Sequence, residues 1–164
     1  MARTDKYTQD AREWRMAAER TLRAATLLFN LNDPFVWFSA ALLGHHALEM
    51  LLKSALIRAG CPVEKGKTEA GFVWGHDLDK LAKLLASKRQ DFSLQISPHL
   101  EMPLISCTTY LARYDVFFNE LRYPNASPNV DSLGPGRDEA ELLAELMDGI
   151  RPLAFPLSDG ELQS

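Results

Sequence analysis

The stretch that decides the fold is DPFVWFSAALLGHHALEMLLKSALIRAG, which runs from Asp33 to Gly60. Asp33 is a favourable helix cap, and Pro34 suits the first helical position because the N–H that it lacks would have no partner there. Gly60 is expected to end the helix in the left-handed conformation. Seventeen of the 26 residues between these two caps are apolar, and they are spread nearly all round the cylinder. The pattern therefore predicts a central helix that other helices cover.

The few polar residues of this helix are the next feature of interest. His45, Glu49 and Lys53 are spaced four apart along one stripe, and His46 lies beside it. The simplest interpretation is an intrahelical Glu49–Lys53 pair with histidines that are interior or half-buried. Adjacent histidines on a helix point about 100° apart, so this pair is a poor start for a metal site. With only four histidines and two cysteines in the chain, we expect no metal and no cofactor.

Composition places the chain among globular proteins. It has 164 residues, 46% of them hydrophobic and 24% charged, which suits a single domain with its own core. No membrane span is expected, because no apolar run reaches 18 or more uncharged residues. The two cysteines predict no disulfide framework, and the N-terminal residues lack the apolar segment of a secretory signal, so we expect a cytoplasmic protein. The net charge of −4 argues against broad coating of nucleic acid.

Helical spacing of apolar residues continues outside the central helix, and no segment alternates as a strand does. A first helix is expected to begin at Thr8, with Trp14, Ala18, Ala25 and Leu28 as its buried stripe. The sequence predicts an all-α fold, an up-and-down helical bundle of four long helices plus a fifth C-terminal helix. The expected helices after the central one span residues 77–88, 103–121 and 137–150. The expected domain limits are a tail at 1–7, a single helical domain at 8–151 and a tail at 152–164.

One face of the first helix is strongly charged. It carries Arg12, Arg15, Glu19, Arg20 and Arg23. The main interpretation is a solvated face with local ion pairs, since charged helix faces usually have no other role. The alternative is a ridge that binds phosphate groups.

The helix expected at 103–121 is the richest in chemistry. Arg113 lies among Tyr110, Tyr114 and Phe117, where a guanidinium either stacks on aromatic rings or binds a phosphate, and both interpretations stay open. With Phe118, these aromatic residues occupy more faces than one core absorbs, which favours a homodimer.

Two further sites carry open alternatives. Arg122 and Tyr123 end the helix expected at 103–121, where the helix dipole alone accounts for the arginine and ligand contact is the alternative. His76 follows Gly75 at a helix start, where it either caps the helix or fixes the loop, or meets a ligand.

Four parts of the sequence resemble the HEPN-domain family. They are the opening helix with Trp14, AALLGHHALEMLLKSALIRAG at 40–60, GHDLDKL at 75–81 and ARYDVFFNELRYP at 112–124. The resemblance implies an all-α bundle that commonly dimerises through helix faces. Members act as metal-independent endoribonucleases, as toxin partners of small nucleotidyltransferases, or as nucleotide- and RNA-binding modules without catalysis.

The chain departs from the catalytic members at one position. These members carry an arginine followed after four to six residues by a histidine, whereas Arg113 is followed there by Phe118, Asn119 and Glu120. An amide does not transfer protons near neutral pH as imidazole does.

The resemblance and this departure together favour a non-catalytic module that binds a nucleotide or RNA as a homodimer. The candidate ligand-binding residues are Arg113, Asn119, Arg122, Tyr123 and His76. The alternatives are an endoribonuclease toxin of a toxin–antitoxin or defence system, and a structural adaptor that binds another protein. The resemblance also implies a nucleotidyltransferase or antitoxin as partner.

Overall fold

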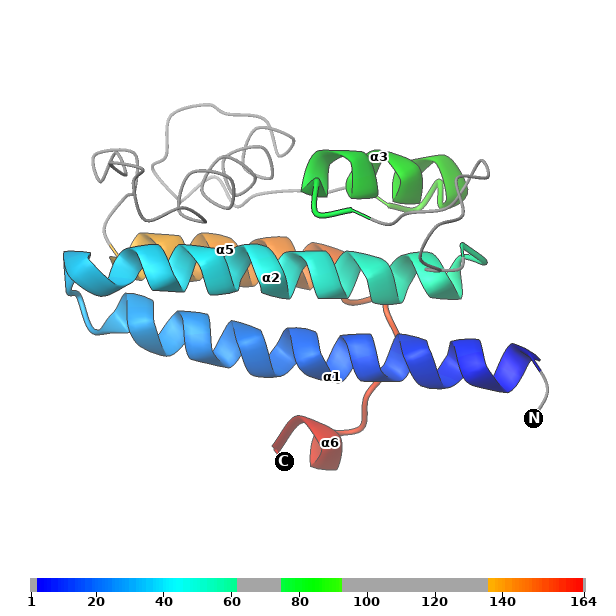
Figure 1. The fold of residues 1–164 in the computed structure, drawn as a ribbon, viewed down its shortest axis with the longest axis horizontal. Helices are drawn as coiled ribbons and strands as arrows, with labels where there is room; N and C mark the ends of the chain where they lie inside the picture. The colour runs from blue at the N-terminus through cyan, green and yellow to red at the C-terminus, as the bar shows by residue number, and fades with distance from the viewer. Residues whose placement is uncertain (1–2, 62–74, 93–135, 164) are drawn as a thin grey trace.

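The computed structural model describes residues 3–61, 75–92 and 136–163 of the chain (Figure 1). These residues form α1 (Arg3–Asn30), α2 (Pro34–Arg58), α3 (Leu78–Lys88), α5 (Gly136–Ile150) and the short α6 (Asp159–Gln163). No strand occurs among them, and the prediction of an all-α fold is confirmed. The helix expected at 103–121 lies outside the described residues.

Helix α2 is the centre of the bundle, as predicted. It runs beside α1, and it also contacts α3 and α5 (Figure 1). Fourteen of its 25 residues are buried, and Leu48, Leu51, Leu52 and Leu56 have no exposed surface. Burying leucines of this kind contributes about 1.5–3 kcal/mol each. The core is completed by the stripes of α3 and α5, which include Leu78, Leu81, Leu85, Leu142, Leu143 and Leu146.

The ends of α2 have the predicted chemistry. The Asp33 side chain accepts a hydrogen bond of 3.0 Å from the N–H of Phe35, and Pro34 begins the helix. At the other end Gly60 has a φ of 86°, the left-handed conformation that a residue without a Cβ adopts at little cost. The turn from α1 into α2 uses Asn32 at a φ of 53°, a conformation that asparagine tolerates better than most residues. The two long helices are thus joined by a tight, defined turn.

By length and composition alone α2 could also cross a membrane, although Glu49 and Lys53 interrupt its uncharged run. The core helix of a globular bundle meets the same criteria, and α1, α3 and α5 all pack against α2. Its apolar character is therefore explained by its central place in the bundle.

The two ends of the chain differ from the prediction. Helix α1 begins at Arg3, ahead of the expected cap at Thr8. Beyond Pro152, where a tail was expected, Leu153 and Ala154 are buried, and α6 contacts α1. Helix α1 lies far from α6 in the sequence, so local periodicity does not reveal their contact.

Candidate functional site

A cluster of ionisable side chains lies on the core helix α2. His45, Glu49 and Lys53 are all buried, with at most 3% of each residue exposed. Their spacing of four residues places them on one side of the helix, as the sequence predicts. A charge in a core is stable only where hydrogen bonds or an opposite charge compensate for its lost hydration, so the partners of these groups determine their role.

Glu49 is the centre of this cluster. Lys53 Nζ donates to Glu49 Oε1, which confirms the predicted intrahelical pair. His76 Nδ1 also donates to the carboxylate, at 3.0 Å from Oε1 and 2.9 Å from Oε2. Burial by itself raises the pKa of Glu49, but the hydrogen bonds from Lys53 and His76, together with the charges of both groups, outweigh it and lower the pKa. Glu49 is therefore a fixed carboxylate that organises its neighbours.

His76 is held at this place from both sides. Its backbone oxygen accepts a hydrogen bond of 2.8 Å from His45 Nε2, and its ring donates to Glu49. The next residue, Asp77, caps α3 by accepting a hydrogen bond from the N–H of Lys80 at 3.0 Å. Capping is thus the role of Asp77, whereas His76 anchors the loop to α2. About half of the His76 side chain is exposed, at 49%.

His46 provides a second half-exposed imidazole beside the same carboxylate. Its Nδ1 lies 3.8 Å from Glu49 Oε2, and 47% of the side chain is exposed. Partial burial lowers the pKa of His46, although the charge of Glu49 works in the opposite direction. His45, by contrast, is fully buried, so the interpretation of an interior and a half-buried histidine agrees with the structure.

Lys53 lies between Glu49 and an aromatic ring. Its Nζ is 5.0 Å from the centre of the Trp14 ring, a cation–π distance. The cluster therefore contains a buried ion pair with two half-exposed imidazoles at its edge. Within residues 3–61, 75–92 and 136–163, no three histidine, cysteine, aspartate or glutamate side chains are placed to hold a metal ion.

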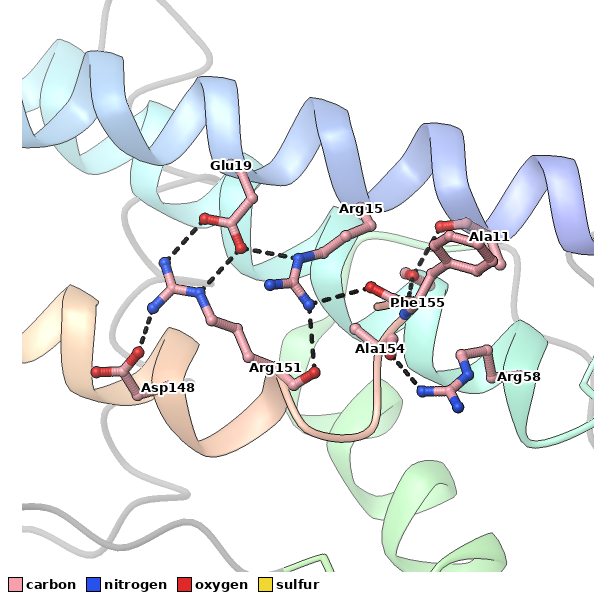
Figure 2. A network of polar contacts seen from close by, with 9 residues as sticks. Ala11, Arg15, Glu19, Arg58, Asp148, Arg151, Ala154 and Phe155 are labelled. Atoms are coloured by element: carbon pink, nitrogen blue, oxygen red, sulfur yellow. Dashed lines mark hydrogen bonds and ion pairs between the residues drawn. The ribbon is translucent and has the colours of Figure 1, made fainter. Parts of the chain in front are cut away.

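The charged face of α1 contains a local ion pair, Arg15–Glu19, as expected, but part of the face is not solvated (Figure 2). Arg15 is only 6% exposed, so the interpretation of a solvated face is wrong for this residue. Arg15 donates to Glu19 at 2.8 Å, and Arg151 donates to the same carboxylate at 2.9 and 2.8 Å. Burial by itself raises the pKa of Glu19, but the two guanidinium groups, with Arg151 the larger influence, lower it.

Arg15 on this face and Ser54 of α2 both bind the backbone of the segment after α5. Arg15 Nη1 donates to the carbonyls of Arg151 and Phe155, at 3.2 and 3.3 Å. Ser54 of α2 accepts from the N–H of Phe155 at 3.1 Å and donates to the carbonyl of Ala11 at 2.7 Å. Arg15 therefore fastens the C-terminal segment to the bundle and is not part of a phosphate-binding ridge.

The sequence model of the HEPN domain family matches residues 11–153, which is most of the chain. The chain belongs to the HEPN-domain family. No curated protein and no solved structure gives a significant match.

The HEPN assignment relates directly to the cluster on α2. The segments at 40–60 and 75–81, which carried much of the resemblance, meet where His76 contacts Glu49. Sequence reasoning paired Glu49 only with Lys53 and missed this contact, because the two residues lie 27 positions apart. The joint occurrence of the two segments was the available signal. Of the predicted ligand-binding residues of this HEPN domain, His76 is described, whereas Arg113, Asn119, Arg122 and Tyr123 lie outside the described residues.

Proposed function

We propose that this HEPN domain is a non-catalytic module that binds a nucleotide or RNA as a homodimer. One observation carries the proposal. This chain belongs to the HEPN family and has Arg113, but it has no histidine at positions 118–120, where it has Phe118, Asn119 and Glu120. Loss of the imidazole removes a proton-transfer group, but the guanidinium keeps its charge and its fork of donors for a phosphate. Binding can therefore persist without chemistry.

The first experiment measures binding by calorimetry with mononucleotides and short single-stranded RNAs. A charge-assisted hydrogen bond contributes about 1.5–3 kcal/mol, so Arg113→Ala should weaken binding by roughly ten- to a hundredfold. Arg89→Ala is the matched control, because it removes the same charge from the end of α3, where Arg89 pairs with Asp91 at 2.6 Å. Binding heat that is equal in wild type and Arg113→Ala contradicts the proposal.

The Glu49–His76 contact favours a second candidate function, an endoribonuclease that uses an unusual site. A carboxylate on Nδ1 fixes the tautomer of a histidine and directs proton transfer to Nε2, as in many enzymes. His76 has this arrangement and is half-exposed. This candidate requires that purified protein cleaves RNA and that His76→Ala abolishes cleavage in a protein that circular dichroism shows to be folded, although loss of the hydrogen bond to Glu49 should lower its melting temperature. His46→Ala is the control, because it removes a neighbouring imidazole that lies farther from Glu49.

A further inference from the structure

A groove lies between α1 and the C-terminal segment that ends in α6. It has a volume of about 380 Å³. In Figure 1, α6 lies on the side of α1 that faces away from α2, so the groove is on the outside of the bundle. A hollow of this volume has room for about a dozen non-hydrogen atoms, at roughly 30 Å³ each, the share of a water molecule in the liquid. The groove is therefore large enough for a small molecule, near the lower limit of ordinary ligand pockets.

Methionine and leucine side chains form much of this groove. Five of its ten lining residues are of these two types. Leu22, which is only 8% exposed, belongs to the core and marks the base of the groove, and Met16 on the same helix is half-buried. Leu157 and Leu162 line the groove from the C-terminal segment. Because small-molecule sites are mostly apolar with a few polar groups, this lining suits an aliphatic chain.

The acidic residues that line the groove are already paired with arginines. Glu19 is bound by Arg15 and Arg151. Glu161 pairs with Arg12, with 2.8 Å between Arg12 Nε and Glu161 Oε1. The negative charges of the lining are therefore compensated from within the chain.

Two further arginines of α1 line the groove and have no acidic partner among the described residues. Arg20 and Arg23 are both exposed and lie three positions apart, which places them on one side of the helix. Arg23 Nη2 donates to the carbonyl of Leu162 at 2.8 Å, and this neutral acceptor leaves the charge of the guanidinium in place. An arginine fork binds a carboxylate through two parallel hydrogen bonds. The groove thus combines an apolar base with two positive groups.

We propose that this groove binds a small amphipathic anion, an aliphatic chain of about eight to ten carbons that ends in a carboxylate. The chain lies against Leu22 and the two leucines of the C-terminal segment, and the carboxylate accepts hydrogen bonds from Arg20 and Arg23. An uncharged molecule of the same shape lacks the second of these interactions, and a short carboxylate lacks the first. The proposal does not depend on the nucleotide- or RNA-binding function.

Nuclear magnetic resonance of the full chain, labelled with ¹³C at its methionine methyl groups, tests this site, because Met16 lines the groove and Met147 is fully buried in the core. Titration with octanoate to about 20 mM should shift the Met16 signal toward saturation. The expected dissociation constant is about 0.1–5 mM, the range for a ligand of roughly ten non-hydrogen atoms. The Met147 signal should not move. Butyrate should give no saturating shift, and octanol should bind about threefold or more weakly than octanoate, because it carries no charge.

Arg20→Gln is the variant that tests the positive side of the groove. It should weaken octanoate binding by about three- to tenfold, since it removes a charged hydrogen-bond donor at an exposed site. Arg89→Gln is the matched control, because it removes the same charge from the end of α3 and should leave the dissociation constant unchanged. An unchanged Met147 signal in each free variant shows that the core is intact.

Four results overturn the proposal. The first is a Met16 signal that octanoate does not move, and the second is a Met147 signal that moves as much as that of Met16, which indicates general surfactant action. The third is binding of octanol or butyrate as tight as that of octanoate, which removes the role of the charge or of the chain. The fourth is an equal effect of Arg20→Gln and Arg89→Gln on octanoate binding, which shows that the Arg20 guanidinium does not hold the carboxylate.

Discussion

Replacing Glu49 by glutamine is the sharpest perturbation of the buried cluster. The substitution keeps the size and shape of the side chain and removes the charge that Lys53 and His76 share. A glutamine oxygen can accept a hydrogen bond from one of the two donors. Its NH₂ group then faces the other donor and cannot accept a hydrogen bond from it. Lys53 loses its acidic partner at a site where 4% of its side chain is exposed, and it retains only its other contacts, including the Trp14 ring.

The magnitude follows from this burial. Removing one partner of a buried ion pair costs about 3–5 kcal/mol. The ring of Trp14 still stabilises the ammonium group, so the lower part of that range, about 3 kcal/mol, is expected. For a domain of this size each kcal/mol changes the melting temperature by roughly 2–4 °C, which gives a decrease of about 6–12 °C.

Thermal unfolding followed by far-ultraviolet circular dichroism at neutral pH measures this decrease. The control is the double variant Glu49→Leu/Lys53→Met, which removes both charges and leaves no buried ammonium. It should melt above Glu49→Gln, since replacing a buried pair by apolar groups is often tolerated. A Glu49→Gln protein that melts within about 2 °C of the parent would show that the carboxylate does not hold the cluster together.

The acid dependence of stability provides an independent check on the same residue. The pKa of Glu49 is lower in the folded chain than its ordinary value of 4.5, so the unfolded chain takes up this proton more readily. The stabilisation is therefore complete above pH 4.5 and is lost as the pH falls through the folded pKa. Urea unfolding of Glu49→Gln should show a weaker decrease over that interval than the wild type. Equal slopes would contradict the assigned pKa direction.

Three other predictions concern the core, the C-terminal segment and the half-exposed histidine. Leu48→Asp should unfold the domain, because Leu48 has no exposed surface and a carboxylate there enters the core. A variant that unfolds at the temperature of the parent, as followed by circular dichroism, would contradict the central place of α2. Ser54→Ala should lower the free energy of unfolding by about 1–3 kcal/mol in urea titrations, since it leaves the backbone groups of Phe155 and Ala11 without this partner. A change near zero would show that the two hydrogen bonds of Ser54 do not stabilise the fold. His46 should titrate below 6.5 in nuclear magnetic resonance spectra because partial burial disfavours its charged form, and a midpoint above 6.5 would contradict this.

Much of the fold follows from local sequence. Asp33, Pro34 and Gly60 set the ends of α2 through the conformational preferences of single residues, and the structure confirms all three. The Glu49–Lys53 pair was also predictable, because residues four apart on a helix are neighbours whatever the rest of the chain does.

The parts that could not be predicted depend on contacts between distant segments. Arg15 looked like a surface residue until the segment after α5 was found to cover it, at a separation of 136 residues from Arg151. The same holds for His76, a loop residue whose partner Glu49 lies on helix α2. A helical pattern reports which side of a helix is apolar, but it does not report which distant polar group compensates a buried charge.

The most direct test of the account is a time course of fluorescently labelled single-stranded RNA with nuclease-free protein, read for binding by anisotropy and for cleavage on a gel. The account predicts that wild-type protein binds the RNA and leaves it intact. Arg113→Ala should reduce the binding, and the RNA should again stay intact on the gel. Asn119→His, which places an imidazole six residues after Arg113, is the variant expected to gain cleavage. Wild-type cleavage that disappears in Arg113→Ala, or binding that is independent of Arg113, would contradict a non-catalytic phosphate-binding HEPN domain.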